Sequence, residues 1–129
     1  MADTGPTYGD LLFVTDKDRC VGIETLLARC GVKVARAESG VQALSALDAE
    51  PWAVMVADAM LPDMDGVELT RAARAKRPGM FVILGSADPS EKLGDHAAMA
   101  GVAGIVHTPY EPDELLPLLC VVMQSRVWN

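Results

Sequence analysis

Aromatic side chains are scarce in this chain of 129 residues, which contains two Phe, two Trp and two Tyr. A folded core must therefore be aliphatic, and since half of the residues are apolar, a disordered chain is excluded. Lys and Arg number only 11 against 18 Asp and Glu, and they form no basic patch. Because phosphate contacts need clustered cations, we expect no direct binding to nucleic acid or to an anionic membrane.

Three further features are absent from the sequence. The cysteines Cys20, Cys30 and Cys120 form no CxxC motif, so we interpret them as buried thiols in a reducing cytosol. The longest apolar run, 115–123, is too short to span a bilayer and contains Pro117, and no signal peptide is visible. We therefore expect a soluble, cytoplasmic protein. A dinucleotide-binding enzyme is disfavoured because no G-x-G-x-x-G follows the first predicted strand.

Short apolar runs alternate with helical patterns along the rest of the chain. The runs predict strands at 11–14, 32–37, 53–57, 80–84 and 104–108, and the patterns predict helices at 19–29, 40–50, 66–77, 90–100 and 111–126. Strands separated by single helices predict a parallel sheet with helices on both faces. We expect a loose N-terminal tail at 1–9, one domain at 10–126 and a C-terminal tail at 127–129.

Small polar or acidic side chains stand at the ends of four predicted strands. They are Asp16, Asp58, Ser86 and Thr108. Because the carboxyl ends of parallel strands share one edge of a sheet, we expect these side chains to lie close together. Two carboxylates with nearby main-chain carbonyls are typical of a Mg²⁺ site. Beside such a cation, Asp58 would be a carboxylate nucleophile toward a phosphoryl group. Taken alone, Asp58 is also compatible with a loop-initiating Asp, and Ser86 with a local turn bond.

The segment 58–66, Asp-Ala-Met-Leu-Pro-Asp-Met-Asp-Gly, resembles the phosphoacceptor loop of the receiver domains of two-component response regulators. In that loop an Asp is followed by Pro four residues on, and then by Met-Asp-Gly. Residues 11–16, 38–44, 83–87 and 101–110 also fit the family in order. The resemblance implies an α/β, flavodoxin-like (βα)5 fold, a doubly wound parallel sheet with strand order 2-1-3-4-5.

The resemblance also implies the roles of individual residues. It places the phosphoacceptor on Asp58 and the switch hydroxyl on Ser86. It places the metal ligands on Asp16, Asp58 and the main-chain carbonyl of Met60, with Mg²⁺ as the cofactor. The phosphoryl donor implied is a sensor histidine kinase or a phosphotransfer protein.

Three positions depart from the family pattern. Thr15 replaces the first of two adjacent acids, and Thr108 stands in place of the Lys that pairs with the phosphoryl group. Ile105 replaces the switch aromatic of the last strand. We therefore expect weaker cation binding and no point charge for the phosphoryl group. The family's usual Pro falls on Pro109, so the Thr108–Pro109 peptide is expected to be cis.

Two functional hypotheses follow from these matches and departures. In the first, a receiver accepts a phosphoryl group on Asp58, with at most self-phosphorylation and autodephosphorylation as enzymatic activity. In the second, a degenerate receiver is a phosphorylation-independent interaction or dimerisation module. Both would use a surface on the fourth and fifth helices, where we expect His107, Tyr110 and Glu111 to be exposed. A phosphohydrolase like the haloacid dehalogenases is disfavoured because it needs a second Asp where this chain has Met60.

Overall fold

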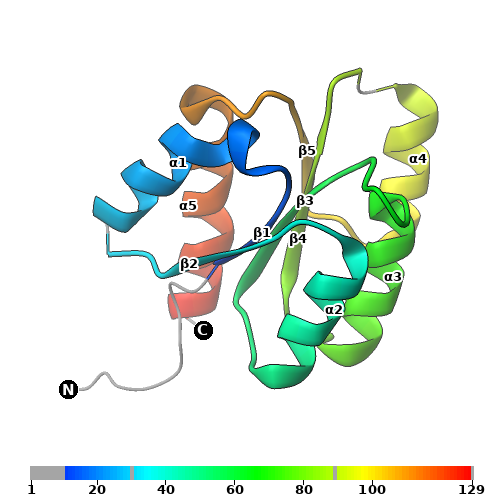
Figure 1. Ribbon diagram of the computed structural model, residues 1–129, viewed down its shortest axis with the longest axis horizontal. Helices are drawn as coiled ribbons and strands as arrows, with labels where there is room; N and C mark the ends of the chain where they lie inside the picture. Colours follow the sequence, from blue (N-terminus) through cyan, green and yellow to red (C-terminus); the bar gives the residue numbers. More distant parts are fainter. Residues whose placement is uncertain (1–10, 30, 89, 129) are drawn as a thin grey trace.

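A computed structural model describes residues 11–29, 31–88 and 90–128 of the chain. The expected N-terminal tail at 1–9 and the last residue, Asn129, lie outside the described residues. Figure 1 shows one sheet between two layers of helices.

The described residues form alternating strands and helices in the predicted order. The strands are β1 (Leu11–Val14), β2 (Val34–Ala37), β3 (Val54–Asp58), β4 (Phe81–Ser86) and β5 (Gly104–His107). The helices are α1 (Lys17–Arg29), α2 (Gly40–Ala49), α3 (Gly66–Lys76), α4 (Glu91–Ala100) and α5 (Pro112–Trp128). Each end lies within two residues of its predicted position, and α5 continues through two residues that were predicted to belong to the C-terminal tail.

All strand pairs are parallel, and the strand order is β2-β1-β3-β4-β5. Helices α1 and α5 cover one face of the sheet, while α2, α3 and α4 cover the other (Figure 1). The predicted doubly wound fold is therefore confirmed. The register pairs Asp58 with Gly85 and Ser86 with His107, so the carboxyl ends of β3, β4 and β5 share one edge.

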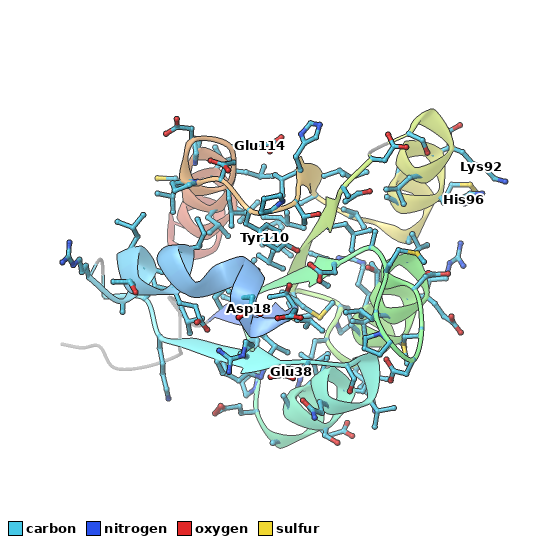
Figure 2. All side chains as sticks on the ribbon, turned by 45° about the horizontal axis from the view of Figure 1, so that its top comes forward. Asp18, Glu38, Lys92, His96, Tyr110 and Glu114 are labelled. Atoms are coloured by element: carbon cyan, nitrogen blue, oxygen red, sulfur yellow. The ribbon has the colours of Figure 1, made fainter. Side chains whose placement is uncertain are left out.

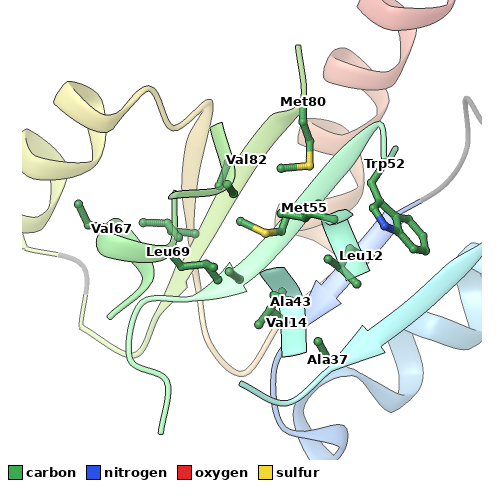
Figure 3. Packing of buried hydrophobic residues seen from close by; sticks show 14 of the residues in the cluster. Leu12, Val14, Ala37, Ala43, Trp52, Met55, Val67, Leu69, Met80 and Val82 are labelled. Atoms are coloured by element: carbon green, nitrogen blue, oxygen red, sulfur yellow. The ribbon is translucent and has the colours of Figure 1, made fainter. Parts of the chain in front are cut away.

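The apolar strands supply two cores because neighbouring side chains point to opposite faces of the sheet. Leu12 and Met55 belong to the core beneath α2, α3 and α4, part of which is seen in Figure 3. Leu11 and Phe13 belong to the core that also contains Leu115 of α5. All residues of β3 are buried, as expected for a central strand covered on both faces.

Helix ends follow the capping signals in the sequence. Ser39, the N-cap of α2, accepts a hydrogen bond from the backbone N–H of Gln42 at 3.1 Å, and Asp65 and Ser90 cap α3 and α4 in the same way. Gly31, which lies just beyond the end of α1, has a φ of 83°, in the left-handed region that glycine tolerates.

Helices α2 and α3 are joined at their C-terminal ends. The guanidinium of Arg77 donates two hydrogen bonds to the carbonyl oxygen of Leu47, at 3.0 and 2.7 Å. The ammonium of Lys76 lies 2.8 Å from a carboxylate oxygen of Asp48. These contacts link the last turn of α2 to the end of α3.

The expectation of buried thiols is wrong for Cys120, which is exposed on α5. The inward face of α5 is formed instead by Leu115, Leu119 and Val122. The side chains of Cys20 and Cys30 lie outside the described residues. Within 11–29, 31–88 and 90–128, no helix combines the length and apolar character needed to cross a bilayer.

Candidate functional site

Asp58 is the last residue of β3, and its side chain is only 4% exposed. It borders a pocket of about 260 Å³ formed by the loops that follow β1, β2 and β3. The pocket is lined by Asp16, Glu38, Asp58, Met60, Leu61 and Pro62. Three of these described lining residues are carboxylates and none is a cation, so the pocket is acidic.

Two buried hydroxyl groups hold the carboxylate of Asp58. Thr15 donates a hydrogen bond from Oγ1 to Oδ2 at 2.8 Å, and Tyr110 donates from its phenolic oxygen to Oδ1 at 2.7 Å. Thr15 is fully buried. Thr15, which replaces the first acid of the family's pair, therefore contacts Asp58, the predicted phosphoacceptor, directly. The sequence did not reveal this role.

The expectation that Tyr110 is exposed is wrong, because its side chain is only 5% exposed. Its ring and the ring of Phe13 form a T-shaped contact, with the ring centroids 4.9 Å apart. In Figure 2, Tyr110 lies inside the molecule between α5 and the strands, whereas Lys92 and His96 project from α4. The sequence contained one signal, Gly85, because a glycine inside a buried strand often marks the close approach of another group.

The predicted metal ligands Asp16, Asp58 and Met60 border the same pocket. Asp16 is exposed, and its Oδ1 accepts a hydrogen bond from the backbone N–H of Asp18 at 2.8 Å. Two carboxylates and a main-chain carbonyl are hard oxygen donors, which fit a Mg²⁺ ion that keeps several waters. The described residues contain no group of three or more His, Cys, Asp or Glu that could hold a metal.

Ser86 and Thr108 are not among the described residues that line this pocket. Ser86 is half-buried, and its Oγ accepts a hydrogen bond from the backbone N–H of Asp88 at 3.2 Å. Ser86 borders a larger groove of about 900 Å³ between α3 and α4, which shares Met60 with the pocket. The backbone N–H of Thr108 donates to the carbonyl oxygen of Ser86 at 3.0 Å, and the Thr108–Pro109 peptide is cis as expected.

Asp63 fixes the loop after Asp58 to the start of α2. This contact was not predicted from the sequence. Its two carboxylate oxygens accept hydrogen bonds from the backbone N–H groups of Gly40 and Val41, at 2.8 and 2.9 Å. Both bonds lower the pKa of the Asp63 carboxyl, and the bond from Gly40 has the larger effect. The loop and the N-terminus of α2 are therefore expected to move as one unit.

His107 and Glu111 are exposed, as predicted for the surface near α5. The backbone N–H and ring Nδ1 of His107 lie 2.9 and 3.1 Å from the carboxylate oxygens of Glu114. Both hydrogen bonds from His107 lower the pKa of Glu114, and the bond from the backbone N–H has the larger effect. This pair connects the end of β5 to the first turn of α5.

Comparisons with known proteins point to one family. Residues 12–119 match the sequence profile of the response regulator receiver domain. The chain is 28% identical over 107 residues to the transcriptional regulatory protein ZraR of Escherichia coli (strain K12), and 26% identical over 111 residues to the DNA-binding transcriptional regulator NtrC of the same strain. These alignments cover 82% and 84% of this chain but 24% of each relative, so the chain spans about a quarter of their length.

Solved structures give the same result. The receiver domain of a CheY-like response regulator from Methanospirillum hungatei JF-1 has a TM-score of 0.82 and 26% identity, covering 90% of this chain and 94% of that one. The signal receiver domain of an HD domain-containing protein from Pseudomonas fluorescens Pf-5 has a TM-score of 0.83 and 25% identity, covering 93% and 97%. Both similarities extend over nearly the whole of each chain.

Proposed function

The chain belongs to the family of response regulator receiver domains, the signal-receiving modules of two-component systems, and on that premise we propose that it accepts a phosphoryl group on Asp58. The donor would be a sensor histidine kinase or a phosphotransfer protein in the cytoplasm. One observation supports this assignment most strongly. Asp58 ends the central strand β3 and borders the acidic pocket together with Asp16 and Met60.

The proposed reaction is a phosphoryl transfer between two side chains. A carboxylate oxygen of Asp58 attacks the phosphorus, and the P–N bond of the phosphohistidine breaks with its electron pair on the imidazole nitrogen. The product is an acyl phosphate on Asp58 and a histidine that takes up a proton. Receiver domains generally bind Mg²⁺ at this site, where the cation offsets the negative charge of the carboxylates and the phosphoryl group. In this chain Asp16, Asp58 and the carbonyl of Met60 would hold it.

Ser86 and Thr108 are proposed to contact the transferred phosphoryl group. The Ser86 Oγ accepts a hydrogen bond from Asp88, so its own proton is available for donation to a phosphoryl oxygen. Thr108 can offer a hydroxyl but no charge, so we expect a weaker response than a lysine would give. Enzymatic activity would be limited to self-phosphorylation from a small phosphodonor and to autodephosphorylation.

We also propose that the surface formed by α4, β5 and α5 carries the output, as a homodimer contact or an effector contact. Met99 of α4 is 82% exposed and Val121 of α5 is 60% exposed. These are the apolar side chains that a partner on this surface would cover.

The test is to incubate the purified protein with a phosphoryl donor and to measure the mass of the intact protein by mass spectrometry. With acetyl phosphate and Mg²⁺, the protein should gain one phosphoryl group, and the variant Asp58→Asn should gain none. Asp95→Asn is the matched control because it removes an exposed carboxylate on α4. It should be labelled like the unmodified protein.

Absence of labelling in the unmodified protein, or equal labelling of Asp58→Asn, would contradict the proposal. A phosphorylation-independent interaction module is not favoured. Such a module would be supported only if the unmodified protein was not labelled and if Asp58→Asn bound the partner as tightly as the unmodified protein does.

A further inference from the structure

We propose that Tyr110 is a positioning residue that acts through Asp58, and that its hydroxyl restrains the carboxylate and slows phosphorylation. This inference rests on the proposed function, because it concerns the rate of the same reaction. It assigns a role to a side chain that is hidden from the solvent.

The first argument is the way in which the Asp58 carboxylate is held. Each of its oxygens accepts a hydrogen bond from a buried hydroxyl group, Oδ2 from Thr15 and Oδ1 from Tyr110. The described residues that line the pocket contribute further carboxylates, Asp16 and Glu38, and no cation. These two neutral donors therefore contribute to stabilising the negative charge of Asp58.

The second argument is that the chain makes room for the Tyr110 hydroxyl. A Cβ atom added to Gly85 would overlap the phenolic oxygen and the adjacent ring carbons of Tyr110. Gly85 pairs with Asp58 in the sheet, so the space left by its missing side chain lies directly beside the carboxylate. On the other side the ring packs against Phe13.

The backbone near Tyr110 also limits its movement. Pro109 precedes it, and Pro112 opens α5 two residues later. Proline fixes φ, so this short segment has few alternative conformations. The backbone around Tyr110 is thus restricted, and the packing of its ring restricts the side chain.

The energetic argument compares the reactant with the product. Hydrogen bonds to a charged acceptor are about twice as strong as those between neutral groups. When Asp58 becomes an acyl phosphate, its own carboxyl group loses the negative charge, and one oxygen becomes the bridge to phosphorus. The bond from Tyr110 therefore stabilises the free carboxylate more than the transition state or the product, and a group that stabilises the ground state more slows the reaction.

The primary test is the variant Tyr110→Phe, which keeps the ring and removes the hydroxyl. Phosphorylation by acetyl phosphate with Mg²⁺ should be faster by roughly tenfold, which corresponds to about 1.4 kcal/mol. The gain should appear in the maximal rate, and the Mg²⁺ concentration that gives half of that rate should be unchanged. Thr70→Val is the matched control, because Thr70 is a fully buried hydroxyl that donates to the carbonyl oxygen of Gly66, not to Asp58.

A second variant displaces the hydroxyl without removing it. Gly85→Ala should push Tyr110 away from Asp58 and raise the rate in the same direction. The double variant Gly85→Ala with Tyr110→Phe should be no faster than Tyr110→Phe, since both changes remove the same bond. Additive gains would overturn the proposal.

A spectroscopic measurement separates restraint from packing. The chain contains two tyrosines, Tyr8 and Tyr110, so with Tyr8→Phe a ¹³Cζ-tyrosine label reports on Tyr110 alone. Its signal should shift on phosphorylation and in Asp58→Asn, because the acceptor changes in both. A signal that stays fixed would show that Tyr110 only fills space.

The possible failures are distinguishable. If neither the unmodified protein nor Tyr110→Phe acquires a phosphoryl group, the proposed function fails and the restraint fails with it. If the unmodified protein is labelled and Tyr110→Phe is labelled at the same or a lower rate, only the restraint is overturned. Labelling of Tyr110→Phe alone would support the restraint, while the unlabelled unmodified protein would contradict the proposed function.

Discussion

Thr108 brings a neutral side chain to the position where the receiver family has a lysine. It is half-buried, and its backbone is bonded to Ser86 at the end of β4. We predict that Thr108→Lys strengthens the response to a phosphoryl group, because the ammonium adds a charge-assisted bond to an anion.

The measurement is the rise in melting temperature when beryllofluoride, a phosphoryl mimic, is added with Mg²⁺. The rise should be larger in Thr108→Lys than in the unmodified protein by about 3–5 °C, the size expected for about 1 kcal/mol in a domain of this length. Ser45→Lys, on the exposed side of α2, adds the same charge elsewhere and should leave the rise unchanged. An equal rise in both variants would mean that the missing lysine does not limit the response.

The residues of the pocket differ in how far they could be predicted from the sequence. Asp16 and Asp58 were found because they stand at strand ends, and parallel strands bring their carboxyl ends together. Met60 followed from the resemblance to the receiver family. Tyr110 was placed on the surface because loop residues after a strand are usually exposed. Its burial depends on the missing side chain of Gly85 and on Phe13, which come from two other strands, and a pattern read along one segment does not contain that combination.

Asp63 shows how a single loop residue affects an element. Its carboxylate accepts the N–H groups of Gly40 and Val41, which would otherwise lack acceptors at the start of α2. We predict that Asp63→Ala lowers the melting temperature by a few degrees at neutral pH, the effect typical of losing a helix N-cap. Asp95→Ala, an exposed change on α4, is the control and should have little effect.

The same contact predicts a pH dependence. The pKa of Asp63 is lowered in the folded protein, so its contribution to stability is present above the unfolded pKa of about 4 and is lost as the pH falls through the folded value. The difference in melting temperature between the unmodified protein and Asp63→Ala should therefore shrink on acidification below about pH 4. A difference that stays constant into strong acid would show that the carboxylate charge is not involved.

Helix α5 explains why element positions were predicted better than exposure. Its existence follows from acidic residues in the first turn and a long apolar pattern, and its observed ends agree with this within two residues. The pattern is apolar almost all round, however, so it does not reveal which side faces the sheet. Leu119 is buried while the neighbouring Cys120 and Val121 are exposed, and the sheet that decides this is built by distant parts of the chain.

The molecule as a whole has one predicted output surface, on α4, β5 and α5. If the domain self-associates through this surface, Met99→Glu and Val121→Glu should weaken the dimer at least tenfold, because a charge would replace a buried apolar group. Sedimentation equilibrium, with and without beryllofluoride and Mg²⁺, measures the dissociation constant. Val41→Glu on α2, a residue that is 61% exposed, should have no effect. Equal weakening by Val41→Glu would place the contact elsewhere.

The pairing of α2 with α3 has a practical consequence for experiments in solution. The two helices are fastened near both ends, by Asp63 at one and by Arg77 and Lys76 at the other. They therefore provide a fixed reference within the molecule. A spin label on Ser45 of α2 and another on Ala98 of α4, both exposed, would measure whether α4 moves relative to α2 when the domain is phosphorylated.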